Sequence, residues 1–506
     1  MAPKRKRMKL EEAAAQELED VPVEYKETPE VPKRKQKVFL ETLNDDCIYT
    51  ILGKLSLSNL CAVSKTCRRL HTLASNQFMR CHKSKVMTIK DVTENGDLVV
   101  PQKEEEYIRC FAKSMENVTF GRLLAKKATL REVNKAYHFK KTDTMAPIKI
   151  LRIDNWARGL RMSHRPALAK LVNGVESITV SNTKVYGDLN ACLLQHIPDM
   201  KRLTLCQQFE EKPGDATINW MQQIYPKLEY FAWHANSELP VAEAKQLLKL
   251  NPNISFFSLY TKSRNTLRRL MDEQIHINEL YVDVMRTDIP AIFNDLHDLC
   301  EQRFCDRLHL KFSDFTRHTL TNKMDQLILL GPYIEGLYFE KIGIDGNFAR
   351  TINTFDQLKV LQLNIAVNAS LLSKALSLQE IFAYWGVNSQ NFKSYQEAML
   401  MYAANTPTLK KIYLRNNSQL FDRFNFDVLN LVRQKLDGAR KLKIYFKSEE
   451  CEFTGKLNDV NCDFDMVEVM RVETEHVANP LITEYLTTRQ LSTENNSYMQ
   501  YKYGRY

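Results

Sequence analysis

The chain has 506 residues, of which 44% are hydrophobic and 26% charged, and its formal net charge is +10. This length allows several domains or one long array of repeats, and no apolar run approaches the roughly 20 residues that a membrane-spanning helix needs. Eleven cysteines without a Cys-x-x-Cys pair argue against a zinc module and fit a reducing nuclear or cytoplasmic setting.

Residues 1–37 form a polar stretch that opens with the basic cluster Lys4, Arg5, Lys6 and Arg7. The composition of this stretch, with acidic, basic and proline residues and few apolar ones, predicts disorder. Importins read short lysine–arginine runs as arrays of positive charge, so the cluster predicts import into the nucleus. The alternative is a solvated tail that no receptor reads.

Residues 38–80 carry the spacing of two or three short amphipathic helices. Asn44 and the two acids after it favour a helix start, because short polar side chains cap free amides and acids suit the positive end of a helix. So small a unit buries little surface by itself, and its periodicity also fits an ordinary helical hairpin inside a larger domain. The apolar positions at helical spacing are Ile48, Ile51, Leu52, Leu55, Leu60, Val63, Cys67 and Leu70.

From Leu43-Asn-Asp-Asp to Cys67-Arg68, these residues resemble the F-box, the motif that binds the Skp adaptor of cullin-based ubiquitin ligases. The sequence departs from the family at Asn44, where proline is usual, and after the arginine, where a tryptophan commonly follows. The resemblance implies a docking surface for the Skp adaptor. It assigns that contact to Leu43, Ile48, Ile51, Leu52, Leu55, Leu60 and Val63.

Residues 81–475 repeat the unit apolar-x-x-apolar-x-apolar. The first positions of the outermost units, Met115 and Ala439, are 324 residues apart over twelve steps, a mean spacing of 27 residues. Helix-like segments at 241–250, 289–301 and 392–404 separate some units, and Phe464/Val467/Val469 is a candidate terminal unit. A proline two residues before a unit ends the preceding helix and favours an extended start to a strand. Such prolines are Pro198, Pro226, Pro252, Pro332 and Pro407.

These segments resemble the irregular leucine-rich repeats that often follow an F-box, although they lack the regular asparagine after the strand. The resemblance implies an α/β fold: a small helical F-box followed by a leucine-rich-repeat solenoid, with parallel strands on the concave face and helices on the convex face. The expected organisation is a tail at 1–37, the F-box at 38–80, the solenoid at 81–475 and a C-terminal tail at 476–506. The tyrosine-rich last stretch is expected to be disordered or to lie on the solenoid.

Residues between the apolar positions should line the concave face, which is rich in aromatic residues and cations. Such side chains bury large areas and pair with acidic groups, so we expect the face to hold a protein segment. An acidic or phosphorylated segment would bind around Arg307, His309, Lys311, Lys411 and Arg415. The alternative is that the aromatics shield the sheet while the cations solvate it. The candidate residues are Tyr230, His234, Phe256, Tyr260, Tyr281, Arg307, His309, Lys311, Tyr338, Phe382, Tyr384, Lys411, Tyr413 and Arg415.

Sequence signals for catalysis are missing. The chain has 15 glycines but no glycine-rich phosphate loop, no Gly-x-Ser-x-Gly and no His-Glu-x-x-His. Cys300 and Cys305 fit core packing better than ligation. We therefore expect no enzyme activity in the chain itself, no cofactor and no metal.

The first functional hypothesis is a substrate receptor of a Skp–cullin–F-box ubiquitin ligase in the nucleus and cytoplasm. Its partners would be the Skp adaptor, the cullin scaffold and an unidentified protein target, with no membrane. The second hypothesis is a non-degradative leucine-rich-repeat scaffold or nuclear interaction protein. Nucleic-acid binding ranks last, because the cations alternate with acids such as Glu279 and Glu380.

Overall fold

The computed structural model describes residues 43–82, 87–90, 106–121, 148–284, 289–312, 324–339, 350–363, 377–384, 403–415, 426–447 and 461–471, with short gaps at 108–109, 112–113, 157–158, 163–164, 208, 213–219, 262–263 and 404–405. The predictions for the tails at 1–37 and 476–506, including the basic cluster Lys4–Arg7, lie outside the described residues. Most of the predicted helix at 392–404 also lies outside them.

Three helices form the first unit: α1 (Asp45–Leu52), α2 (Leu57–Ser64) and α3 (Arg68–His82). The side chain of Asn44 accepts a hydrogen bond from the Cys47 amide at 2.8 Å, and Ser56 caps α2 in the same way. The asparagine therefore caps α1 at the position where the F-box family usually has proline. Ile48, Leu60 and Phe78 bury their side chains between the three helices.

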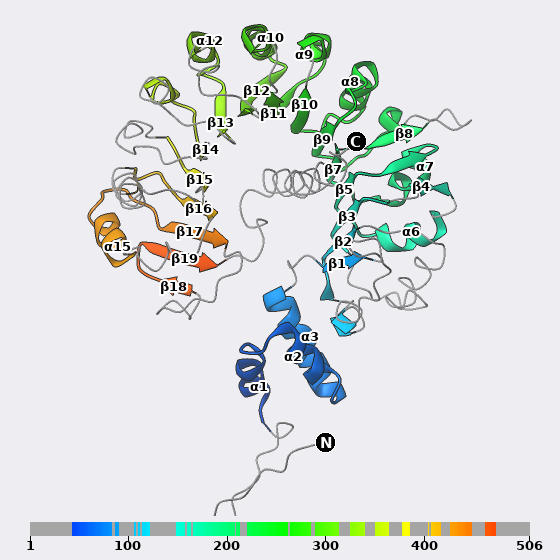
Figure 1. The fold of residues 1–506 in the computed structure, drawn as a ribbon, viewed down its shortest axis with the longest axis vertical. Coiled ribbons are helices and arrows are strands. Elements are labelled where there is room, and N and C mark those ends of the chain that lie inside the picture. Colours follow the sequence, from blue (N-terminus) through cyan, green and yellow to red (C-terminus); the bar gives the residue numbers. More distant parts are fainter. Residues whose placement is uncertain are drawn as a thin grey trace, which may run out of the picture.

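One sheet of sixteen strands follows within the described residues, and Figure 1 shows its strands succeeding one another in chain order up to β17. The last two strands are exchanged, with β19 beside β17 and β18 at the edge. Each strand pairs in parallel with its neighbours in the sheet, including β17 with β19, except that β18 pairs antiparallel with β19. A small parallel sheet of β4, β6 and β8 lies apart from it. The strands of the large sheet are β1 (Met87–Lys90), β2 (Asn117–Gly121), β3 (Ile150–Asp154), β5 (Ser177–Ser181), β7 (Arg202–Gln207), β9 (Tyr230–Ala235), β10 (Phe256–Thr261), β11 (Ile277–Val284), β12 (Cys305–Phe312), β13 (Ile334–Phe339), β14 (Val360–Leu363), β15 (Glu380–Tyr384), β16 (Lys411–Arg415), β17 (Leu442–Lys447), β18 (Asn461–Asp463) and β19 (Val467–Arg471); those of the small sheet are β4 (Leu160–Arg161), β6 (Lys184–Tyr186) and β8 (Glu210–Lys212).

The longer helices between the strands lie on one side of the sheet, as Figure 1 shows for α8, α9, α10, α12 and α15. The main hydrophobic core fills the space between these helices and the strands, where Phe231 stacks on Phe257 with ring centroids 5.5 Å apart. The helical segments are α6 (Arg165–Val172), α7 (Leu189–Cys192), α8 (Val241–Leu250), α9 (Arg264–Leu270), α10 (Ile289–Glu301), α12 (Met324–Leu329) and α15 (Phe426–Gln434), with 3-10 turns η4 (Leu194–His196) and η5 (Trp220–Gln222).

The thirteen predicted repeat units coincide with strands of the large sheet from β2 to β17, and the candidate terminal unit coincides with β19. The predicted helices 241–250 and 289–301 are α8 and α10. Each of the five marker prolines lies in a turn ahead of a strand, as at Pro226 before β9. The prediction of an α/β chain with a small helical unit followed by parallel strands is therefore confirmed.

Polar groups tie successive strand units together. The fully buried guanidinium of Arg433 on α15 donates hydrogen bonds to the carbonyl oxygens of Ala403, Thr406, Leu409 and Arg440, at 2.8, 2.9, 3.0 and 2.5 Å. Burial lowers the pKa of Arg433 to about 10. The side chain thus satisfies carbonyl groups that would otherwise be buried without donors.

A second tie is the carboxylate of Glu176, just before β5. It accepts hydrogen bonds from Lys149, before β3, and from Lys201, before β7, the latter at 2.8 Å. These hydrogen bonds lower the pKa of Glu176 to about 2 from an ordinary value of 4.5. The bridge therefore links three consecutive units along one end of their strands.

Glu176→Gln should remove a pH-dependent part of the stability. A carboxyl whose folded-state pKa is lowered stabilises the fold above its unfolded pKa, near 4.5, and loses that contribution as the pH falls toward 2. The three side chains are all partly exposed, so we expect a loss of only about 0.3–1 kcal/mol at pH 7. Urea unfolding at pH 7, 4 and 2.5 measures it, and the gap to wild type should close as the pH falls. Glu273→Gln is the control, because Glu273 makes no ion pair with a described residue; an equal effect there would contradict the prediction.

Candidate functional site

The seven residues predicted to contact the Skp adaptor divide into two groups in the structure. Ile51 on α1 is 40% exposed, and Leu43, Leu55 and Val63 are half-buried. The remaining three, Ile48, Leu52 and Leu60, are buried in the core of the helical unit. These three side chains cannot contact the adaptor directly in the described chain, because they point into the core that α1 and α2 form with α3.

An ion pair holds the start of α1 against α3. The Arg69 guanidinium donates to Asp45 Oδ1 at 2.6 Å and to the Leu43 carbonyl oxygen at 2.7 Å. This clamp fixes the backbone at Leu43 and therefore the position of the first apolar side chain of the predicted docking surface. The pair is largely exposed, so its contribution to stability is small, about 0–1 kcal/mol.

The second candidate site is the sheet face that points away from α8, α9, α10, α12 and α15, here called the helix-free face. Side chains alternate along each strand, so Leu203 and Leu205 of β7 enter the main core while Thr204 lies on the helix-free face. Most of the predicted target-binding residues lie on this face. Tyr384, Tyr413 and Arg415 belong to β15 and β16, but their side chains are outside the described part.

The aromatic residues of the helix-free face pack against one another rather than standing free. Tyr230 stacks on Phe256 with centroids 4.9 Å apart, and Tyr281 contacts Tyr338 at 5.6 Å. Together with Ala232, Val360 and Phe382 they form a second buried apolar cluster. This packing favours the interpretation that the aromatics shield the sheet. Tyr260 is half-buried and buried His234 bonds Ser258 at 2.6 Å.

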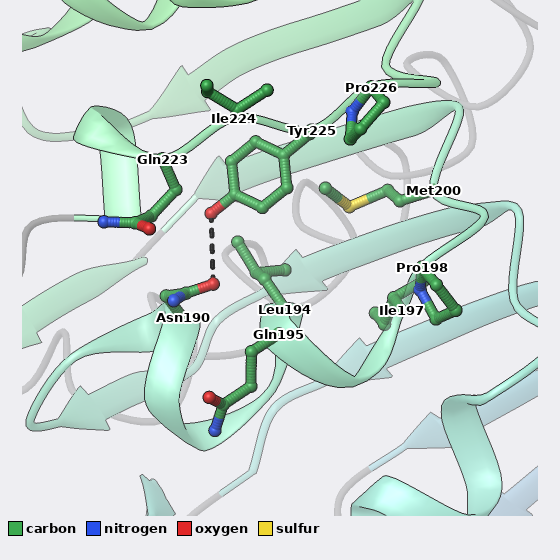
Figure 2. A pocket seen from close by; sticks show the side chains of 10 residues that line it. All are labelled: Asn190, Leu194, Gln195, Ile197, Pro198, Met200, Gln223, Ile224, Tyr225 and Pro226. Atoms are coloured by element: carbon green, nitrogen blue, oxygen red, sulfur yellow. Dashed lines mark hydrogen bonds between the residues drawn. The ribbon is translucent and has the colours of Figure 1, made fainter.

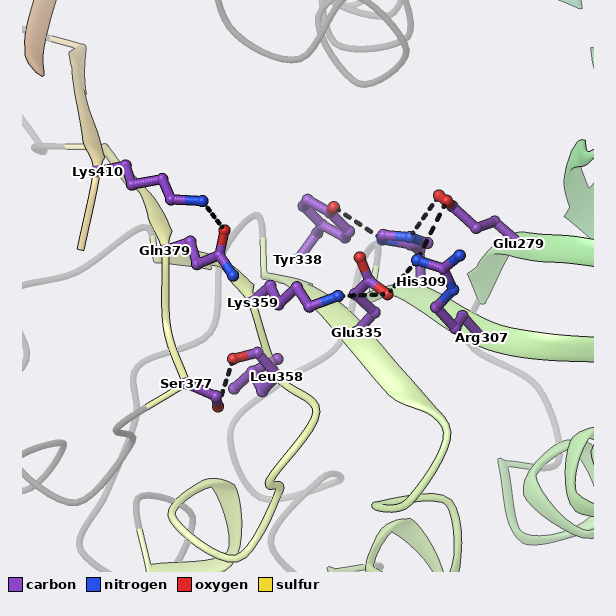
Figure 3. Close-up of polar contacts among 10 residues, drawn as sticks. All are labelled: Glu279, Arg307, His309, Glu335, Tyr338, Leu358, Lys359, Ser377, Gln379 and Lys410. Carbon is purple, nitrogen blue, oxygen red and sulfur yellow. Dashed lines mark hydrogen bonds and ion pairs between the residues drawn. The ribbon is translucent and has the colours of Figure 1, made fainter. Parts of the chain in front are cut away.

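Two of the residues predicted to attract an acidic segment, Arg307 and His309, contact carboxylates of the same face, as Figure 3 shows. Arg307 pairs with Glu335 at 3.0 Å and lies 3.7 Å from Glu279, while buried His309 contacts Glu279 at 3.2 Å. The hydrogen bond from His309 lowers the pKa of Glu279. Lys411 pairs in the same way with Glu380 at 2.9 Å. Arg307 and Lys411 are therefore already neutralised within the sheet, and Glu279 already occupies the His309 side chain.

Lys311 was predicted to be an accessible cation, and this prediction is wrong for the described chain. Its exposed fraction is 0%, and its register neighbours on the adjacent strands are Asp283 and Tyr338. A side chain buried between two strands cannot offer its charge to a partner at the surface. Charge reversal at Lys311 would therefore test the stability of the sheet and not the capture of a target.

A register shift between Leu308 and His309 sets the geometry of this network. It brings Gly336 opposite His309, whose Nδ1 lies 3.2 Å from the Tyr338 hydroxyl. A Cβ atom on Gly336 would lie 2.4 Å from His309 Nδ1 and 2.7 Å from the Tyr338 oxygen. Position 336 therefore requires glycine, because a larger side chain would collide with His309 and Tyr338.

Gly336→Ala should displace the His309 and Tyr338 side chains and cost about 1–3 kcal/mol of stability, typical of overpacking a buried site. Differential scanning calorimetry measures the loss. Gly438→Ala is a steric control, because a Cβ there meets no atom within 4 Å, although its φ of +67° adds backbone strain. A melting temperature for Gly336→Ala equal to that of wild type would contradict the prediction.

A cavity of about 210 Å³ lies on the helix side of the sheet (Figure 2). Its walls come from two consecutive units, with Leu194, Met200 and Tyr225 lining it and the Tyr225 hydroxyl 3.4 Å from Asn190 Oδ1. The lining has no charged side chain, and its polar groups are the amides of Asn190, Gln195 and Gln223 and the Tyr225 hydroxyl. Ile224 at its rim is strongly exposed.

Two arginines of the helix-free face, Arg152 on β3 and Arg202 on β7, were not among the predicted binding residues, although the strand pattern had placed Arg202 on this face. Sequence reasoning also missed that Glu335 pairs with Arg307. The alternation around Leu151 and Ile153 could have placed Arg152 on this face, but only the structure gives its surroundings. Within the described ranges, no cluster of His, Cys, Asp and Glu is arranged to hold a metal ion, and no helix has the length and apolar character to cross a bilayer.

Comparison with known proteins identifies the helical unit. Residues 40–81 match the F-box domain family, and no curated protein matches the sequence. The matched residues cover α1 and α2 completely and all of α3 except His82. F-box domains bind the Skp adaptor within Skp–cullin–F-box complexes, and the proteins that carry them are generally non-catalytic subunits. The chain carries an F-box domain, formed by α1, α2 and α3.

Proposed function

We propose that this chain is the substrate-recognition subunit of a Skp–cullin–F-box ubiquitin ligase. The observation that carries the proposal is the F-box match at residues 40–81 on a folded three-helix unit with an apolar surface around Ile51. Leu43, Leu55 and Val63 extend that surface, and Ile48, Leu52 and Leu60 support it from inside. The Skp adaptor would connect this surface to the cullin scaffold.

The region after the F-box would be a leucine-rich-repeat solenoid that holds the target protein. Strands paired in chain order, a mean spacing of 27 residues between their units and helices on one side of the sheet all support this assignment. The target would bind on the helix-free face. The chain would contribute no catalytic group, since holding a target beside a ubiquitin-charged enzyme raises the rate through proximity.

The basic cluster Lys4–Arg7 supports a location that includes the nucleus as well as the cytoplasm. Exchanging these four residues for glutamine in a tagged full-length chain tests this part. Loss of nuclear signal supports it, and an unchanged distribution contradicts it.

Co-precipitation of the full chain with the Skp adaptor and cullin tests the proposal. Recovery of both partners, together with cullin-dependent turnover of a bound protein, supports the role of substrate receptor. Recovery without any turnover would favour the non-degradative scaffold instead. Failure to recover the adaptor would contradict both the docking role and the proposed ligase.

A further inference from the structure

Two arginines of the helix-free face flank one strand, β5. The register pairs Arg152 of β3 with Thr179 of β5, and Thr179 with Thr204 of β7. Arg202 of β7 lies opposite Ser177 of β5 in the neighbouring row. Strand β5 lies between β3 and β7 (Figure 1). Since strands are spaced about 4.8 Å apart and rise about 3.3 Å per residue, the two arginine backbones are separated by about 10 Å across the sheet and about 7 Å along it.

Neither guanidinium forms an ion pair or hydrogen bond with another described residue. This separates them from Arg307, which Glu335 and Glu279 bind. Arg152 is only 8% exposed, and a charge so far removed from water is costly unless a partner compensates it. Within the part of the chain that the structure describes, no acidic side chain compensates this buried cation.

A hydroxyl group in the same row also lacks a partner. Thr204 is 4% exposed, and its Oγ1 forms no hydrogen bond with a described residue. A buried hydroxyl left unsatisfied costs about 1–3 kcal/mol. Thr204 lies at the same register level as Arg152, two strands away across β5. It also lies two residues after Arg202 on β7. The unsatisfied donor and the two cations therefore surround the same stretch of β5.

The patch opens to solvent at Ile150 and Arg202, and the described acids around it already have other partners. Ile150, the preceding helix-free-face position on β3, is 41% exposed, and Arg202 is half-buried. Glu176 beside the patch is held by Lys149 and Lys201. The carboxylate of Asp154 accepts hydrogen bonds from Ser181 and Asn182. Among the described residues, no carboxylate contacts either arginine.

We propose that Arg152, Arg202 and Thr204 bind a phosphoryl group on a serine or threonine of the protein substrate. This inference rests on the proposed function for the identity of the ligand as a substrate segment. A phosphate monoester carries about −1.5 to −2 charges and three acceptor oxygens, enough to engage two guanidinium groups and a hydroxyl donor together. A carboxylate has one charge and two oxygens, so it would satisfy one arginine and leave the other cation uncompensated.

The test uses the full chain bound to the Skp adaptor and a degenerate peptide library with a central phosphothreonine. The same library with threonine or glutamate at that position provides the comparison. We expect wild type to retain the phosphothreonine library at least tenfold better than either. Arg152→Gln, Arg202→Gln and Thr204→Val should each lower the affinity for retained peptides, the arginine variants by tenfold or more.

Arg269→Gln is the matched control, because Arg269 is an exposed arginine on α9 without a described partner. Its retention should stay within twofold of wild type. Equal retention of glutamate and phosphothreonine peptides, or unchanged affinity in both Arg152→Gln and Arg202→Gln, would overturn the assignment. Melting temperatures of the variants separate lost binding from lost folding, and Thr204→Val keeps the side-chain shape.

Adaptor capture in the same preparations distinguishes the two proposals. Variants that capture the adaptor normally but lose phosphopeptides support both. Adaptor capture with no phosphate preference overturns only the phosphoryl site. A wild-type chain that fails to bind the adaptor, yet prefers phosphothreonine peptides when tested alone, overturns the ligase role and leaves the phosphoryl site supported.

Discussion

Replacing Ile51 with aspartate is expected to abolish capture of the Skp adaptor while the three-helix unit stays folded. Ile51 is the strongly exposed member of the seven predicted contact residues, with 40% of its surface accessible. An apolar residue at the centre of an interface commonly contributes about 2 kcal/mol or more, which corresponds to roughly a 30-fold loss of affinity. A buried carboxylate without a partner would increase this loss.

The control variants for this experiment distinguish binding from folding. Leu52→Ala alters a neighbour that is 2% exposed and should cost about 2–5 kcal/mol of stability, so its failure to bind would carry no information on the interface. Ile224→Asp makes the same exchange at an exposed isoleucine beside η5 and should leave capture unchanged. Titration of the adaptor by calorimetry, with circular dichroism on each variant, gives both readouts. An Ile51→Asp chain that binds with wild-type affinity would contradict the assigned surface.

Arg433→Met should destabilise the C-terminal part of the sheet by about 3–5 kcal/mol. Methionine fills a similar length but donates no hydrogen bond, so three buried carbonyl groups and the partly buried one of Arg440 lose their donor at once. The lowered pKa of about 10 still leaves Arg433 protonated below pH 9. Since the unfolded guanidinium is also protonated there, we expect the loss to be independent of pH between 6 and 9.

Urea unfolding and amide hydrogen exchange measure the effect of Arg433→Met. Exchange should accelerate in β16, α15 and β17, whose segments the guanidinium connects, and remain unchanged in β3 and β5. Arg269→Met makes the same exchange at the exposed α9 position and should stay within about 0.5 kcal/mol of wild type. A loss below about 1 kcal/mol for Arg433→Met would show that water replaces the guanidinium at little cost.

Much of the fold could be predicted from the sequence because buried strands and helices leave periodic apolar patterns. The spacing around Leu228 predicted β9, and the pattern over 241–250 predicted α8. Strands of two or three residues, such as β4 and β18, are too short to leave a period. The register shift at Leu308 could not be predicted either, because a bulge depends on pairing with a neighbouring strand.

The candidate sites were less predictable, since they depend on which side chains meet. Helical spacing groups Ile51 with Leu52, but only packing against α3 decides that one is exposed and the other buried. Alternation assigns Arg307 correctly to the helix-free face. Whether an arginine there is neutralised depends on carboxylates from neighbouring units, as Glu335 neutralises Arg307 whereas no described acid neutralises Arg152.

The antiparallel strand β18 affects how readily the chain can associate with other copies of itself. A parallel sheet that ends in an unpaired strand offers its backbone to the first strand of another copy, and repeated pairing of this kind produces polymers. β18 covers the ladder of β19 with a strand of three residues, Asn-Cys-Asp, that runs in the opposite direction and is polar at both ends. At this end, so short a strand is a poor template for head-to-tail polymerisation.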